Sequence, residues 1–259
     1  EPSWYRWSNK TEHIVIEEGI TGIGSEAFAG FVKVLSVNIP YTVKKIKRSS
    51  FENNYRLREI QIPNEVISIG DKAFAGCYGL KNLSLPSKLN YVGSFEFCRN
   101  IKSISLPDSI KDTADGMFTG CEMLTSVKLP RKLKSIKSYD FADCRKLTKL
   151  NIPMTVKVVY MSAFAGSGLK KIVLPSNVQK IRNGNDGQKV FEYIKGIGYP
   201  TKNLRVIEIH SKKIKSIQKN SFSGLSSKVV IKVPKSKKKK YTKMLRKSGL
   251  SKKVKICNL

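Results

Sequence analysis

Histidine, cysteine and acidic side chains could do chemistry in this sequence, but their placement argues against a catalytic or metal site. The two histidines, His13 and His210, lie near opposite ends of the chain. A catalytic triad or a metal site needs such side chains to converge. No phosphate-binding glycine loop, nucleophile elbow or metal-binding helix motif occurs. We interpret each histidine as structural and expect a non-enzymatic protein with no catalytic residue, no metal and no cofactor.

Four of the five cysteines follow one spacing rule. Cys77, Cys98, Cys121 and Cys144 each stand three residues before an apolar residue. This position suits a small buried side chain whose thiol meets loop backbone. Neighbouring thiols could come within disulfide range, but we expect them to stay reduced. A line of cysteines does not converge as zinc binding requires. Cys257 is the one thiol expected to be exposed.

The charge is strongly positive, with 49 Lys and Arg against 19 Asp and Glu, or +30. Such a field attracts anionic partners of any kind. The run Lys237, Lys238, Lys239 and Lys240 starts a predicted helix, where it opposes the helix dipole. It is either a patch for an anionic wall polymer or a solvated face. Nucleic acid is a disfavoured partner, because few aromatic residues are free to stack on bases.

A repeat of 21 to 23 residues organises the chain. Proline closes seven apolar segments, and a phenylalanine lies eleven residues after each of the first six prolines. These phenylalanines, which we expect to form a column in the core, are Phe51, Phe74, Phe97, Phe118, Phe141 and Phe164. Two landmarks in step over six units predict a solenoid. A Gly-rich insertion near 183–203 interrupts the last units. Its segment Gly184–Gly187 carries one acid, Asp186, which is too few for calcium.

Each unit predicts one short strand. In the unit from Leu57 to Leu80, Ile60 and Ile62 alternate with polar residues, which is typical of a half-buried strand. Pro63 closes the strand, and Gly70 permits a bend. One unit cannot bury its apolar face alone, whereas stacked units form a continuous core.

These residues resemble the BspA-like leucine-rich repeat, with the pattern L-x-x-I-x-I-P-x-x-V-x-x-I-G-x-x-A-F-x-x-C-x-x-L, over residues 13–234. The resemblance implies an α/β-type, right-handed leucine-rich-repeat arc with a parallel sheet on its concave face. It also implies a bacterial surface or secreted protein that takes part in adhesion and binding. The family pattern contains no catalytic motif.

We expect three parts: an aromatic N-terminal cap at 1–12, about eight or nine repeat units at 13–234, and a basic helix-strand cap at 235–259. Trp4 and Trp7 either cap the first unit or grip a sugar ring. The C-terminal helix is predicted at 235–248, with Tyr241 and Leu245 on its apolar stripe.

The exposed positions of the predicted concave strands are mostly small and uncharged. The candidate ligand-binding residues are Glu59, Gln61, Asn82, Ser84, Ser103, Ser105, Ser126, Lys128, Lys149 and Asn151. Such a face can accept a partner's backbone or hydroxyl groups. It lacks the Trp, Tyr and Arg anchors of strong binding sites, so we expect weak affinity there or binding on another face.

Two functions follow from these observations. The first is an extracellular or cell-surface adhesion module, expected to be monomeric, that binds a host or matrix protein or a glycan. The alternative is a cell-wall-associated structural protein held to anionic polymer by its Lys-rich end. No apolar run approaches the roughly 18 residues that cross a bilayer. We interpret the chain, which does not begin with Met, as the mature part of a longer precursor.

Overall fold

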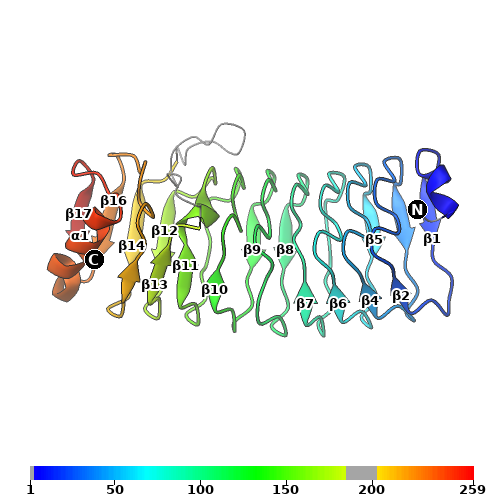
Figure 1. Ribbon diagram of the computed structural model, residues 1–259, viewed down its shortest axis with the longest axis horizontal. Coiled ribbons are helices and arrows are strands. Elements are labelled where there is room, and N and C mark those ends of the chain that lie inside the picture. Colours follow the sequence, from blue (N-terminus) through cyan, green and yellow to red (C-terminus); the bar gives the residue numbers. More distant parts are fainter. Residues whose placement is uncertain (1–2, 185–202) are drawn as a thin grey trace. The chain divides into compact units, whose positions relative to one another are not determined.

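The computed structural model describes residues 3–184 and 203–259, and the chain divides into two compact units, Glu1–Pro130 and Arg131–Leu259. Both units are parallel-strand β-solenoids (Figure 1). Together they contain about 10 turns. The predicted solenoid of parallel strands is confirmed. Its handedness, the concave position of the sheet and the three-part division of the chain stay predictions. The predicted insertion at 183–203 lies almost wholly outside the described residues.

In the first unit, a row of three-residue strands presents a polar outer face. The strands are β1 (His13–Val15), β3 (Ser36–Asn38) and β5 (Glu59–Gln61) in one sheet, and β8 (Ser103–Ser105) and β9 (Ser126–Lys128) in another. β1, β5 and β8 bury their central side chain and expose its neighbours, as Glu59–Gln61 does around Ile60. Strands of successive turns are parallel and in register, with Val37 opposite Ile60.

Two strands expected in this pattern are not formed. Asn82 makes one isolated bridge to Ser103, and the segment of Lys149 and Asn151 has no strand. Both segments lie beside a shortened turn, since the proline spacing falls to 21 residues after Pro86 and to 22 after Pro153.

A second row of strands lines the other side of each turn, and the sequence pattern missed it. In the first unit it contains β2 (Gly22–Ile23), β4 (Lys45–Ile46), β6 (Ser68–Ile69) and β7 (Tyr91–Val92). The expected α/β-type solenoid is therefore corrected to a β-solenoid. No α-helix can form between Ser68–Ile69 and Asn82, because Lys72 and Gly76 adopt positive φ within a few residues of each other.

A stack of phenylalanine rings forms the core of the first unit. The centroids of Phe51 and Phe74 are 5.5 Å apart with nearly parallel planes, and those of Phe74 and Phe95 are 6.3 Å apart. Phe95 is fully buried, whereas Phe97 is 45% exposed. The prediction that Phe97 belongs to the core column is wrong. In the 21-residue turn, Phe95 takes the core position instead.

The second unit repeats the two rows. The outer row contains β12 (Lys171–Leu174), β14 (Val206–Ile209), β16 (Val230–Val233) and β17 (Lys255–Asn258). The other row contains β10 (Ser135–Ile136), β11 (Val158–Tyr160), β13 (Lys180–Arg182) and β15 (Ser216–Ile217). A 3₁₀ helix, η2 (Met161–Phe164), follows β11 directly. The phenylalanine stack recurs here, with the Phe141 and Phe164 centroids 6.4 Å apart.

Short helices lie at both ends of the chain. The 3₁₀ helix η1 (Ser3–Trp7) carries Trp4, whose Nε1–H donates to the Ala27 carbonyl at 2.8 Å and whose ring lies 6.2 Å from Phe28. At the other end, η3 (Lys235–Lys237) leads into the one α-helix of the described residues, α1 (Lys238–Lys247). These contacts fit the cap interpretation of both ends, which stays a prediction.

Candidate functional site

The polar side chains on the outer face of the first unit are free to bind a ligand. Asn82, Ser84, Ser103, Ser105 and Ser126 are all exposed, and the structure gives their side chains no hydrogen bond.

Some exposed hydroxyls at turns of the same unit, by contrast, are hydrogen-bonded to backbone carbonyls. Ser109 Oγ donates to the Leu89 carbonyl at 2.6 Å, and Thr125 Oγ1 donates to the Lys102 carbonyl at 2.9 Å. These turn hydroxyls therefore stabilise the solenoid, whereas the hydroxyls of Ser84, Ser103, Ser105 and Ser126 keep their hydrogen-bonding capacity.

These free side chains surround an open groove of 780 Å³. Ile60, Leu83 and Ile104 line the groove, but their side chains are buried and offer it little surface. Its other lining residues are Asn82, Ser84, Leu85, Ser87, Ser103, Ser105, Pro107, Ser126 and Lys128. Lys128 is the one ionised side chain among them. The groove therefore offers neutral hydrogen-bonding groups with a single positive charge at β9.

Six of the ten predicted ligand-binding residues line this groove: Asn82, Ser84, Ser103, Ser105, Ser126 and Lys128. Glu59 and Gln61 are exposed on β5 but are not part of the lining. Lys149 and Asn151 belong to the second unit, and the structure does not bring them to the groove. Sequence reasoning missed Ser87, because this residue follows the proline that closes the predicted strand.

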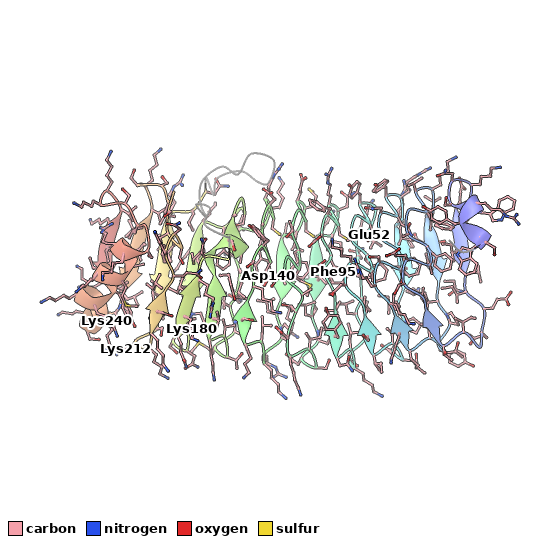
Figure 2. The ribbon with its side chains drawn as sticks, in the orientation of Figure 1. Glu52, Phe95, Asp140, Lys180, Lys212 and Lys240 are labelled. Carbon is pink, nitrogen blue, oxygen red and sulfur yellow. The ribbon has the colours of Figure 1, made fainter. Side chains whose placement is uncertain are left out.

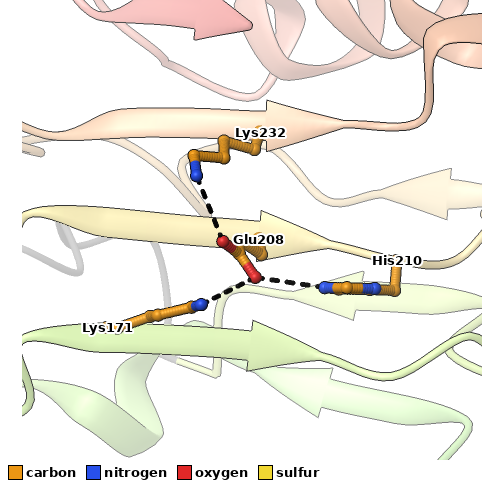
Figure 3. Close-up of polar contacts among 4 residues, drawn as sticks. All are labelled: Lys171, Glu208, His210 and Lys232. Carbon is orange, nitrogen blue, oxygen red and sulfur yellow. Dashed lines mark hydrogen bonds and ion pairs between the residues drawn. The ribbon is translucent and has the colours of Figure 1, made fainter. Parts of the chain in front are cut away.

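A buried carboxylate lies on the outer face of the second unit (Figure 3). Glu208 on β14 accepts the Lys171 ammonium at 2.9 Å and the Lys232 ammonium at 3.4 Å, and His210 Nε2 lies 3.1 Å away. Burial alone would raise the pKa of Glu208, but the hydrogen bonds from Lys171, His210 and Lys232 outweigh it and lower this pKa to about 2. The carboxylate therefore stays ionised and holds both lysines.

This cluster joins neighbouring strands of one sheet, which explains why spacing alone did not predict it. The other histidine, His13, belongs to the first unit, where Nδ1 lies 2.8 Å from the Ser36 hydroxyl.

The cysteine column packs as predicted. The Cys77, Cys98 and Cys121 thiols donate to the carbonyls of Phe51, Phe74 and Phe95 at 3.1, 3.0 and 3.2 Å. Burial raises the pKa of Cys98 to about 12 and that of Cys77 well above its ordinary value. All five cysteines are free thiols. These side chains stabilise the turns rather than act as nucleophiles.

The positive charge is unevenly divided between the two units. The first unit holds 16 Lys and Arg against 14 Asp and Glu, and the second holds 33 against 5. The second unit therefore supplies +28 of the net +30. The predicted patch belongs to it, with Lys237 half-buried and Lys238, Lys239 and Lys240 exposed along η3 and α1.

The described residues contain neither a metal-binding cluster nor a membrane-spanning helix. No group of three or more His, Cys, Asp or Glu side chains there could hold a metal ion. No helix in residues 3–184 or 203–259 has the length and apolar character needed to cross a membrane.

The comparisons with known proteins agree on the family of folds. The family model of the BspA type leucine rich repeat region matches residues 1–97, 93–198 and 193–258, in six copies. A leucine-rich repeat protein from Bacteroides ovatus is 27% identical, with a TM-score of 0.64, over 95% of this chain and 70% of that one. One from T. pallidum is 29% identical, with a TM-score of 0.57, over 61% of this chain and 77% of that one. No curated protein matches the chain.

Proposed function

Because the chain belongs to the BspA-type leucine-rich repeat family, we propose that it is a non-enzymatic binding module that presents the groove of its first unit to a protein or glycan ligand. The family resemblance drawn from the sequence is confirmed. Leucine-rich-repeat solenoids typically bind partners or support structure rather than catalyse reactions. The family resemblance also supports a location outside the bacterial cell or on its surface.

The unbonded polar side chains of the groove support this proposal most directly. The hydroxyl groups of Ser84, Ser103, Ser105 and Ser126 make no hydrogen bond in the structure, although other exposed hydroxyls of the unit do. A ligand with hydroxyl or amide groups can satisfy them, and the half-buried side chains of Leu85 and Pro107 can cover its apolar parts. The groove therefore fits an uncharged, hydrogen-bonding ligand.

The same chemistry limits the affinity. A typical hydrogen bond contributes about 0.5–1.5 kcal/mol net, and association itself costs at least about 4 kcal/mol. Without a Trp, Tyr or Arg anchor in the groove, we expect a dissociation constant of about 1 μM or weaker. Because the lining is mostly neutral, salt should weaken this binding little.

The test is a binding array of glycans and extracellular-matrix proteins, run on the full chain at low and high salt. We expect one glycan or protein to be retained at high salt. The double variant Ser103→Tyr and Ser105→Tyr fills the groove from exposed strand positions, where aromatic residues are well tolerated. It should abolish that binding.

The matched control is Ser25→Tyr, which places the same side chain at an exposed turn of the first unit outside the groove. The control should bind like the unchanged protein. Retained binding in the double variant would overturn the assignment of the groove. An array with no salt-resistant ligand at all would overturn the proposed function.

A further inference from the structure

A row of lysines follows one corner of the second unit. Here the chain bends between the two strand rows, and backbone hydrogen bonds connect successive turns. Lys157 N–H donates to the Lys134 carbonyl at 2.8 Å, and Gln179 N–H donates to the Lys157 carbonyl at 2.8 Å. Lys215 N–H then donates to the Gln179 carbonyl at 2.7 Å. Three of the four residues in this row are therefore lysines, one above another, and all three are exposed.

Further lysines widen this row. Lys180 follows Gln179, and its N–H also donates to the Lys157 carbonyl, at 3.1 Å. Lys212 and Lys213 precede Lys215 in the last of these turns, and both are exposed. We call Lys134, Lys157, Lys180, Lys212, Lys213 and Lys215 the lysine track. Neighbouring strands lie about 4.8 Å apart, so the track offers a positive charge at nearly every turn.

The C-terminal helix extends the track. Ile214 N–H donates to the Tyr241 hydroxyl at 3.0 Å, and this contact joins the track to α1. Ile214 stands between two track lysines, and Tyr241 directly follows Lys240. Figure 2 shows Lys180, Lys212 and Lys240 along the same edge of the second unit. The run Lys237–Lys240 is therefore the end of a longer cationic surface rather than an isolated patch.

The track lysines are not neutralised within the described residues. None of them pairs there with a carboxylate, and the Lys213 ammonium donates to an uncharged group, Asn177 Oδ1, at 3.3 Å. By contrast, Lys171 and Lys232 on the outer sheet are both held by Glu208. The corresponding corner of the first unit carries fewer positive charges. Its four residues, joined by the same backbone hydrogen bonds, are Thr21, Lys44, Ile67 and Asn90.

We propose that the lysine track binds a linear polymer of polyol phosphates, which runs along the row from β10 towards α1. The ligand needs regularly repeated single negative charges, because the cations repeat once per turn. Lysine binds phosphate as a point charge without demanding planar, two-point geometry. Single-stranded nucleic acid would need aromatic rings for its bases. Tyr160 on β11 lies near the track, but the Arg182 guanidinium covers its ring at 5.9 Å.

The experiment measures binding of the full chain to purified poly(glycerol phosphate) over a series of salt concentrations. The test variant changes Lys134, Lys157, Lys180 and Lys215 to Gln. Each charge contact contributes about 0.7 to the slope of log affinity against log salt. We therefore expect the slope to fall by about 3, with weaker binding at low salt. The variant with Lys237–Lys240 changed to Gln should lower the slope as well, because these residues extend the track.

The matched control changes Lys146, Lys149, Lys170 and Lys228 to Gln. These are four exposed lysines of the same unit outside the track, so the net charge changes equally. The slope should stay within about 1 of the unchanged protein, because only contacting charges release counterions. An equal loss in both variants would show a general charge effect and overturn the track. If the fourfold variant does not fold, the pair Lys157→Gln and Lys215→Gln gives the same comparison.

Two further arms identify the polymer and separate this site from the groove. Single-stranded DNA and heparin should bind more weakly than poly(glycerol phosphate) at equal salt. Equal or tighter binding of either would overturn the assignment to polyol phosphate. The groove variant Ser103→Tyr and Ser105→Tyr should bind poly(glycerol phosphate) unchanged, because the groove belongs to the other unit.

Discussion

Replacing Phe95 and Phe97 separately by alanine tests the core of the first unit at two positions only two residues apart. Phe95 is fully buried between two rings, with centroids 6.3 Å from Phe74 and 6.1 Å from Phe118. Phe97 is 45% exposed, with its ring next to Gly120. The two substitutions remove the same atoms, so their difference measures burial alone.

The magnitude follows from the buried surface. A phenylalanine buries about 150–250 Å², which at about 25 cal/mol per Å² gives roughly 4–6 kcal/mol as an upper bound. Each lost ring contact adds about 0.5–1.5 kcal/mol, and partial collapse of the cavity recovers some of the loss. We therefore expect Phe95→Ala to cost about 3–5 kcal/mol, as large core truncations do, and Phe97→Ala to cost about 1 kcal/mol or less.

Urea unfolding followed by circular dichroism measures both variants, with a calorimetric scan as the second probe. Repeat proteins can unfold in steps, so the two probes must agree before a single free energy of unfolding is assigned. We expect the thermal midpoint of Phe95→Ala to fall by roughly 10 °C. Equal losses in the two variants would refute the assignment of Phe95 to the core column. Phe118, also fully buried, should behave like Phe95.

Three further predictions concern single sites. The lowered pKa of Glu208 means that its ion pairs stabilise the fold above about pH 4.5, and that this contribution is lost as the pH falls towards about 2. Glu208→Gln should remove this pH dependence, worth roughly 1 kcal/mol because the partner lysines are half-exposed; a pH series of urea midpoints that matches the unchanged protein would contradict it. Gly70→Ala should destabilise the first unit by about 2 kcal/mol or more, because the added Cβ would lie 2.5 Å from the Arg48 backbone nitrogen. Gly24→Ala is the matched control in the same unfolding assay, since its Cβ would have no atom nearer than 4.0 Å. Alkylation of the native protein should label Cys257 alone, since the other four thiols are buried; mass spectrometry that finds two or more labels would show that the column opens.

The spacing of residues in the sequence predicted part of the groove. Alternation identified the outward positions of each strand, so Ser103, Ser105 and Ser126 were correctly taken as exposed. Spacing did not reveal that Lys149 and Asn151 lie in a different compact unit from the groove. It also could not show which hydroxyls are already bonded to backbone, because those bonds join residues about one turn apart.

The repeat itself determined the solenoid, its parallel strands and the buried cysteine column, because an apolar position that recurs every 21 to 23 residues must stack on its copies. The tertiary structure decided what depends on contacts between turns. It placed Phe95 rather than Phe97 in the core, since the shortened turn lacks two residues between its proline and its core ring, whereas the ring keeps its spacing to Cys98. Gly70 is needed for the close approach of the backbone at Arg48 rather than for a bend alone. The same stacking gathers lysines from separate repeats into one track, because charges far apart in the sequence become neighbours only when successive turns lie a strand spacing apart.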